Sequence, residues 1–472
     1  MQLKELSEKV RNGNLIIDFV SLEISQRSST GINLTGHGVL RIDPDGALTC
    51  DIVCTKAEGI TLERFSAAYP LDHRDKQQVL MLRGVDLSGR EWRAENFALR
   101  LSMLRTAAPF KCSVLLSEVV HEAQQQIPSQ LENYLWFQFS ETSNIPKNKT
   151  NSIDDSLVGQ SRSWNQTDIT VGESTISIID NGDHTTAYVN GKFDVEEMYS
   201  ALKFYIGFTS GSMPNAFLMT CRNSSNVRHH IRSINKRINL STMPYPIEEH
   251  LALSAEEWNH KYHYELLRNI IHVQNKNPLF YESTVSQWKR TWQGFTAQQS
   301  LAALALTVSI EGLLIDLFIP QLKKDIESAD FEKTKREIIE KLTTLKIDEK
   351  HVETLVDGVN RWGNIHASAA LKILADKGLI TKQEVQAWKD LRNGSTHPKF
   401  SDATPERESK ELKRLTHCLN LYYKLNLNIY AYKGGHVIYD RDNTMSVIFP
   451  SIRIFDPLDD HSASLSVSPA QD

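Results

Sequence analysis

The chain has 472 residues, with 53 Lys and Arg against 58 Asp and Glu, and its formal net charge is −5. This length predicts two to four domains, and the recurrence of aromatic and branched apolar residues throughout excludes a largely disordered chain. The acidic balance excludes a protein that coats nucleic acid through bulk positive charge, so any nucleic-acid binding must be local.

Cysteine usage and hydropathy predict a cytoplasmic protein. The five cysteines are scattered and odd in number, which is typical of a reducing compartment rather than of a disulfide framework. The first residues, MQLKELSEKVRNG, lack the apolar stretch of a signal peptide. Residues 301–320 are apolar and long enough to span a bilayer, but Glu311 and Asp316 would each cost about 2.5–3.5 kcal/mol at its centre. We therefore expect a buried helix with one polar face, and no membrane partner.

The first part of the chain has the alternation of antiparallel strands. Residues 34–55 contain two alternating apolar runs around the turn sequence Asp43-Pro44-Asp45-Gly46, and residues 76–101 repeat this pattern around Asp86-Leu87-Ser88-Gly89. Further short apolar runs follow, including 203–211, while the polar segment 142–166 is typical of a mobile loop. We predict a β-rich N-terminal domain, sandwich-like or barrel-like, over 1–220.

A basic segment follows, and we interpret 221–250 as a linker. Residues 221–240 contain five Lys and Arg side chains and no acid, so the segment is a candidate RNA-binding strip. The alternative is a solvated linker, or a helix face packed against an acidic neighbour. The candidate RNA-binding residues are Arg228, Arg232, Lys236 and Arg237.

From about residue 251 the apolar period becomes helical and predicts an α-helical bundle over 251–434. Residues 435–455 predict a terminal β-hairpin, and 456–472 predict a disordered tail. The fold class is therefore α+β, with a sheet region followed by a helical region. The aromatic residues Trp362, Trp388, Tyr422 and Tyr423 could stack RNA bases, but at helical spacing we expect them in the core or at a dimer interface.

Several common catalytic motifs are absent from the sequence, among them the nucleotide-binding P-loop, H-E-x-x-H and G-x-S-x-G. The remaining candidate is an Arg followed closely by a His near a helix end. RNA contains its own nucleophile, the 2′-hydroxyl, so its cleavage needs only proton transfer and stabilisation of the phosphorane charge. A His can move the protons near neutral pH, and an Arg offers a permanently charged fork to the phosphate. No metal or other cofactor is then required.

Three Arg/His pairs match this pattern, about as many as chance predicts, so their context must decide. Arg392 and His397 follow an amphipathic run, Gly394 can end the helix, and Pro398 blocks its continuation. Arg361 and His366 lie inside an apparently continuous helix, where five residues separate them by about 140°. Arg222 and His229 belong to the basic segment. The context favours Arg392 and His397, although a helix C-cap whose Arg binds a neighbouring carboxylate is the alternative.

The helical half resembles a HEPN domain over about residues 280–430. The family signature is an Arg, usually a polar residue, three to five further residues and a His, and RNGSTH (392–397) satisfies it. The segment ALTVSIEGLLIDL (305–317) is similar to the first core helix of the family, which carries an acid. Together with the β-rich N-terminal half, the organisation resembles the ApeA-like HEPN proteins of bacterial abortive-infection defence.

The resemblance implies a metal-independent endoribonuclease in which two HEPN domains pair, as a homodimer or a higher oligomer, so that both motifs line one cleft. Arg392 would stabilise the phosphate, His397 would act as general acid or base, and Asn393 would orient one of them or the RNA. Glu311 would hold Arg392, unless it neutralises another buried cation. The substrate would be host RNA, with tRNA one candidate, and a phage component would act as trigger at the N-terminal domain. The alternative is a non-catalytic HEPN protein that binds nucleotides or pairs with a nucleotidyltransferase antitoxin.

Overall fold

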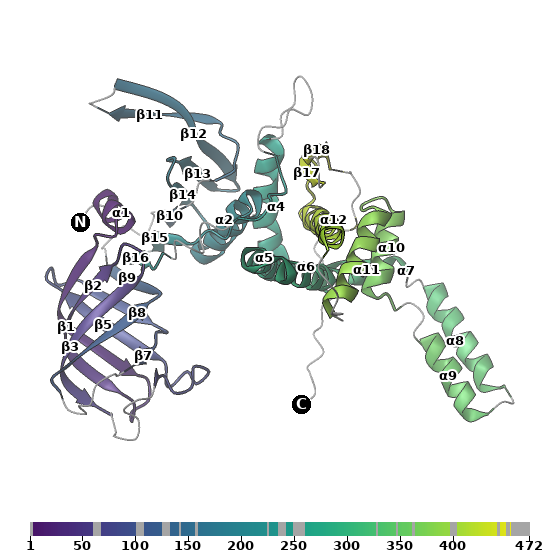
Figure 1. Ribbon diagram of the computed structural model, residues 1–472, viewed down its shortest axis with the longest axis horizontal. Coiled ribbons are helices and arrows are strands. Elements are labelled where there is room, and N and C mark those ends of the chain that lie inside the picture. Colours follow the sequence, from purple (N-terminus) through teal and green to yellow (C-terminus); the bar gives the residue numbers. More distant parts are fainter. Residues whose placement is uncertain are drawn as a thin grey trace. The chain divides into compact units, whose positions relative to one another are not determined.

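The computed structural model describes residues 3–59, 68–100, 108–124, 133–140, 143–155, 159–223, 226–234, 242–248, 260–326, 329–345, 348–360, 364–396, 404–440, 444–449 and 454. The chain forms two compact units, whose helices and strands are labelled in Figure 1. The sheet unit comprises Met1–Ile206 and Met213–Ser241, and the helical unit comprises Gly207–Ser212 and Thr242–Asp472. A large antiparallel sheet region followed by a helical region confirms the α+β class.

Within the described residues of the sheet unit, fourteen strands form one antiparallel sheet in the order β11-β12-β13-β14-β10-β15-β16-β9-β6-β5-β1-β2-β3-β8. Two short strands, β4 (Ala68–Tyr69) and β7 (Leu99–Arg100), pair separately. The helices of this part of the chain are α1 (Leu3–Arg11) and α2 (Val195–Ser210). The strands of the large sheet are β1 (Ile16–Gln26), β2 (Asn33–Ile42), β3 (Leu48–Glu58), β5 (Leu80–Asp86), β6 (Glu91–Glu95), β8 (Phe110–Leu116), β9 (Glu118–Gln124), β10 (Asn133–Phe139), β11 (Lys149–Asp155), β12 (Gly159–Val171), β13 (Ser174–Asp180), β14 (Thr185–Gly191), β15 (Ala216–Asn223) and β16 (Asn226–Arg232).

The strands form where apolar residues alternate, and the predicted turns join them. Along β3 the buried side chains are those of Leu48, Cys50, Ile52 and Cys54, which enter one apolar core with residues of β1, β2, β5, β6, β8 and β9. In the turn before β3, Gly46 has a φ of +85° and the Asp43 carboxylate accepts a hydrogen bond from the amide of Ala47 at 2.9 Å. The turn chemistry read from the sequence is therefore confirmed.

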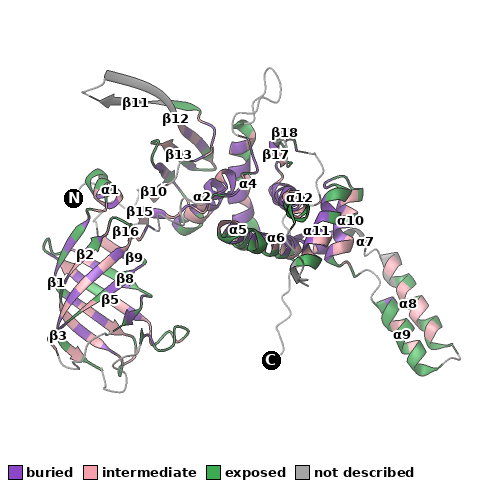
Figure 2. Ribbon diagram, in the orientation of Figure 1, coloured by how far each residue is buried: buried purple, intermediate pink, exposed green. Residues whose placement is uncertain are grey.

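Two elements differ from the sequence-based expectation. Residues 142–166 are not one loop, because they contain β11 and the first part of β12, which pair with each other. Residues 203–211 are not a strand, because 203–210 belong to α2. This helix is apolar around most of its circumference, as its buried residues in Figure 2 show, so it lacks the one-sided periodicity by which a surface helix is recognised.

The predicted linker at 221–250 is wrong over 221–232. Residues 221–223 end β15, and Asn226–Arg232 form β16, which pairs with both β15 and β9. The segment therefore continues the sheet instead of leaving it. Its remaining basic residues, Lys236 and Arg237, lie outside the described residues.

The helical unit has the predicted bundle character, and its terminal hairpin is confirmed where it is described. Residues 450–453 and the predicted tail at 456–472 lie outside the described residues. The elements are α4 (His260–Lys276), α5 (Pro278–Ala297), α6 (Gln299–Leu313), a π-helical turn η2 (Leu314–Phe318), α7 (Ile319–Ile326), α8 (Ala329–Thr343), α9 (Glu349–Asn360), α10 (Ala367–Asp376), α11 (Lys382–Thr396), α12 (Pro405–Ile429), β17 (Gly435–Tyr439) and β18 (Thr444–Ile448).

The core of this unit positions α6 and α11 against α12. Buried aromatic residues fill it, including Trp388, Tyr422 and Tyr423, as expected for aromatics at helical spacing, while Trp362 lies outside the described residues. In the described part of the chain, one helical stretch, Gln299–Lys324, is long and apolar enough to cross a membrane, and 56% of its most apolar window is buried. A buried core helix passes the same test, so this stretch gives only weak support for membrane insertion.

Candidate functional site

The candidate site begins where α11 packs against α6. The Trp388 side chain is buried, and its indole Nε1 donates to the carbonyl oxygen of Thr307 at 3.2 Å. Because residues four apart lie on the same helix face, Arg392 and Glu311 meet one turn further along both helices. Arg392 Nε donates to Glu311 Oε2, and Arg392 Nη2 donates to Glu311 Oε1, each at 2.9 Å. The sequence-predicted contact between Arg392 and Glu311 is present and bidentate.

This ion pair is held firmly yet remains accessible. The side chains of Arg392 and Glu311 are 40% and 28% exposed. The guanidinium carbon also lies 5.6 Å from the ring centroid of Trp388, within the range of a cation–π contact. A planar, permanently charged group fixed in this way can bind a phosphate. The same geometry also fits the alternative in which Arg392 only joins α11 to α6.

The rest of the predicted motif lies at the end of α11. Gly394 does not end the helix, because α11 continues to Thr396. Asn393 is exposed beside Arg392 on the helix surface. His397 is the next residue after the helix and lies outside the described residues. The structure thus brings together Arg392, Asn393 and Glu311, three of the four residues that the sequence singled out here.

The other two Arg/His pairs have different surroundings. Arg361 lies outside the described residues, and the continuous helix expected around it is wrong, since α9 ends at Asn360 and His366 immediately precedes α10. Arg222 and His229 lie on the neighbouring strands β15 and β16. His229 Nδ1 contacts Thr220 Oγ1 at 3.0 Å, and burial, with nearby His121 and His230, lowers the pKa of His229 to about 4.

Two arginines of the basic segment, Arg228 and Arg232, are paired with acids. Arg228 Nε lies 3.4 Å from Glu122 Oε1, and Arg232 Nε donates to Glu118 Oε1 at 2.7 Å. Both pairs join β16 to β9 within the sheet unit, whereas Arg392 belongs to the helical unit. These contacts fit the alternative of a basic segment packed against an acidic neighbour, on a strand rather than on a helix or linker.

An exposed apolar stripe runs along α6 and η2 beside the ion pair. Leu301, Leu304, Val308 and Ile315 are 44%, 39%, 40% and 54% exposed, although the sequence predicted that the exposed face of this helix would be polar. Their spacing of three, four and seven residues places them on one helix face, with Glu311 at the position between the last two. Exposure of this face could not be read from the sequence, because apolar residues also occupy the buried faces of the helix.

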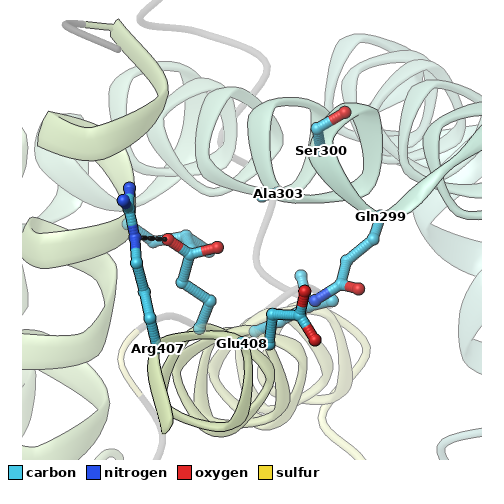
Figure 3. A pocket seen from close by; sticks show the side chains of 8 residues that line it. Gln299, Ser300, Ala303, Arg407 and Glu408 are labelled. Carbon is cyan, nitrogen blue, oxygen red and sulfur yellow. Dashed lines mark hydrogen bonds and ion pairs between the residues drawn. The ribbon is translucent and has the colours of Figure 1, made fainter. Parts of the chain in front are cut away.

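Sequence reasoning also missed a cavity of about 510 Å³ between α6, α11 and the start of α12 (Figure 3). Three separate parts of the chain contribute to it, and one of its apolar residues, Leu391, directly precedes Arg392. The lining residues are Gln299, Ser300, Ala303, Leu391, Arg407, Glu408, Glu411 and Leu415.

Among the described residues, no three His, Cys, Asp or Glu side chains gather in a way that could hold a metal ion. In comparisons with known proteins, no family model, curated protein or solved structure matches this chain. The functional assignment therefore depends on the geometry around Arg392 and on the sequence resemblance.

Proposed function

We propose that this chain is a metal-independent endoribonuclease of the HEPN type, with Arg392 and His397 as its catalytic residues. The observation that carries the proposal is the bidentate ion pair with Glu311, which fixes a partly exposed guanidinium five residues before His397 in the sequence. The resemblance pairs an acid on an apolar helix with an Arg 81 residues later in the chain, and the two side chains meet at hydrogen-bond distance. This agreement supports the HEPN-like interpretation of the helical unit.

The proposed reaction is an internal transesterification of RNA. The 2′-hydroxyl attacks the adjacent phosphorus, and the bond from phosphorus to the 5′-oxygen breaks, which leaves a 2′,3′-cyclic phosphate and a 5′-hydroxyl. Histidine accepts the proton of the 2′-hydroxyl or supplies the proton that the leaving oxygen gains, which is the role assigned to His397. Arg392 stabilises the charge that develops on the phosphorane oxygens, and Asn393 orients the RNA backbone.

A second copy of the chain completes the proposed site. The two proton transfers need an acid and a base, and each copy contributes one His397. The apolar stripe of Leu301, Leu304, Val308 and Ile315 supports pairing through α6, because a contiguous exposed apolar surface is typical of an interaction site. Glu311 lies within this stripe, so pairing along it would bring the two ion pairs close together.

The sheet unit is proposed as the sensor that restrains the nuclease in the cytoplasm. Its extensive sheet carries none of the proposed catalytic residues, which suits a separate recognition role. In this proposal a phage component binds there and releases cleavage of host RNA, such as tRNA, as part of abortive infection.

The proposal is tested by incubating the purified protein with total RNA in excess EDTA, beside Arg392→Ala and His397→Ala. We expect cleavage that survives chelation, leaves 2′,3′-cyclic phosphate ends and disappears in both variants. The same three proteins are also produced in cells that are then infected with phage, which supplies the proposed trigger, and the wild type alone should then cut cellular RNA.

The matched control is Arg414→Ala, because Arg414 is also a partly exposed Arg, paired with Asp390 at 2.8 Å between α12 and α11. His366→Ala controls for the chance Arg/His match. Both controls should cleave RNA normally. Equal activity in Arg392→Ala contradicts the assignment, and absence of cleavage by the wild type in both settings favours the non-catalytic alternative.

A further inference from the structure

We infer that the cavity between α6, α11 and α12 binds a guanine base of the RNA, a few nucleotides from the phosphate that Arg392 contacts. This inference rests on the proposed ribonuclease function and adds the base that the enzyme recognises.

The dimensions and walls of the cavity suit a nucleobase. Its volume of about 510 Å³ is within the range of small-molecule sites, which is about 300–1,000 Å³. Ala303, Leu391 and Leu415 give it apolar surface, and both leucines are 7% exposed. Such surface can cover the face of a flat ring, while polar groups at the rim read its edge.

The polar groups of the cavity are arranged on two sides. On one side, Arg407 Nε donates to Glu411 Oε1 at 3.1 Å, so this carboxylate is already neutralised. On the other side, the side chain of Gln299 extends toward the carboxylate of Glu408 (Figure 3). Among the described residues Glu408 has no ion-pair partner, and its side chain is left to accept hydrogen bonds from a ligand.

The charges that line the cavity favour the binding of a base over the binding of a phosphate. Two glutamates and one arginine line the cavity, which repels a phosphate but attracts hydrogen-bond donors. A carboxylate offers two parallel acceptor oxygens, and guanine presents two adjacent donors, N1–H and the N2 amino group. Adenine places its N1 acceptor beside its amino group, and uracil places its only N–H between two carbonyl oxygens. Glu408 can therefore pair with guanine at both oxygens, and Gln299 can donate to the guanine O6.

The position of the cavity fits a nucleotide bound at Arg392. Leu391 lines the cavity and Arg392 is the next residue of α11, so their Cα atoms are about 3.8 Å apart. On α6, Ala303 and Gln299 lie eight and twelve residues before Glu311, which is about 12–18 Å along the helix, so a base in the cavity would lie a few nucleotides from a phosphate at Arg392.

The test measures the binding of free nucleosides to the full-length protein by saturation-transfer NMR. Nucleosides carry no phosphate, so the readout does not depend on Arg392 or on cleavage. We expect the wild type to prefer guanosine over adenosine, cytidine and uridine. Glu408→Gln should weaken guanosine binding about tenfold, since it removes a bidentate pair. Glu406→Gln is the matched control, because it removes the same charge from the same helix turn at a residue that does not line the cavity.

The outcomes separate this inference from the proposed function. Equal binding of the four nucleosides, or unchanged guanosine binding in Glu408→Gln, overturns the inference even if RNA is cleaved. Guanosine binding by a protein that cuts no RNA supports the cavity assignment and overturns the nuclease. Where cleavage occurs, mapped cut sites should lie at a fixed spacing of a few nucleotides from a guanosine in the wild type and lose this preference in Glu408→Gln but not in Glu406→Gln.

Discussion

The direction in which the Arg392 guanidinium points depends on Glu311. In Glu311→Gln one acceptor oxygen and the charge are lost, so the bidentate contact cannot form. We expect about a hundredfold fall in kcat, because a displacement of about 1 Å in a catalytic group can cost that much. The free energy of unfolding should change by no more than about 1 kcal/mol, since the pair is partly exposed. Single-turnover cleavage and urea unfolding measure the two quantities.

The Arg414–Asp390 pair provides the comparison for this prediction. Asp390→Asn weakens a similarly exposed ion pair between α11 and α12. If Glu311 positions the catalytic Arg, kcat should fall only in Glu311→Gln. An equal fall in both variants would mean that the ion pairs act on activity through general stability alone.

Two buried histidines make the stability of each unit depend on pH. Burial is the main cause that lowers the pKa to about 4 both for His229, in the sheet unit, and for His436, in the helical unit. An unfolded His titrates near 6.5, so between these values the unfolded state binds more protons and the free energy of unfolding falls as the pH falls. Each His contributes up to about 1.4 kcal/mol per pH unit in this window.

We therefore expect the wild type to lose stability from pH 6.5 toward pH 4, and His229→Asn and His436→Asn to lose less. Urea unfolding at pH 7 and pH 4.5, followed by probes in each unit, checks this expectation. A pH slope that neither substitution reduces would show that other groups control the acid sensitivity.

At the level of elements, the sequence indicated strands wherever alternating apolar residues were bounded by turn residues. The turns at Asp43–Gly46 and Asp86–Gly89 were predictable, because Gly46 and Gly89 both adopt a positive φ. The β11–β12 hairpin was not, because its strands are polar and lack apolar alternation. The π turn after Leu313 had no sequence signal either.

The candidate site was predictable only where its residues belong to a local sequence pattern. Arg392 and Asn393 belong to one local motif, and Glu311 stood out as an acid on an apolar helix. The cavity was not predictable, because Gln299, Leu391 and Glu408 come from three helices that only tertiary packing brings together. The exposed stripe was not predictable either, because apolar residues also occupy the buried faces of the same helix.

The apolar stripe on α6 gives a prediction for assembly. Val308 is 40% exposed at the middle of the stripe, so Val308→Asp should prevent pairing without disturbing the core. We expect the wild type to sediment as a dimer or larger species, and the variant to sediment as a monomer with greatly reduced RNA cleavage. Sedimentation velocity measures the mass.

The control is Leu279→Asp, because Leu279 is 54% exposed on α5 and does not belong to the stripe. This variant should retain the oligomeric state of the wild type. Val308→Asp protein that assembles normally would mean that α6 is not the interface.

At the scale of the whole molecule, the net charge of −5 limits how the chain can hold RNA. Arg228 and Arg232 of the basic segment are paired with Glu122 and Glu118, and the cavity beside Arg392 is lined by two glutamates and one arginine. The phosphate contacts of the proposed enzyme are therefore few, and they centre on Arg392. Specificity must come from base recognition more than from the backbone charge.

With so few phosphate contacts, RNA binding should depend only weakly on salt concentration. For single strands the slope of log K against log salt concentration is about −0.7 per phosphate contact, so one Arg392 from each of two copies gives about −1.4. The measurement uses His397→Ala, which should bind but not cut, and a single-stranded RNA oligonucleotide titrated at several salt concentrations. In the double variant that combines His397→Ala with Arg392→Ala, the slope of log K against log salt concentration should be close to zero. A slope steeper than about −4 would require six or more phosphate contacts, and RNA would then bind to an extended basic surface that the paired arginines of β16 do not provide.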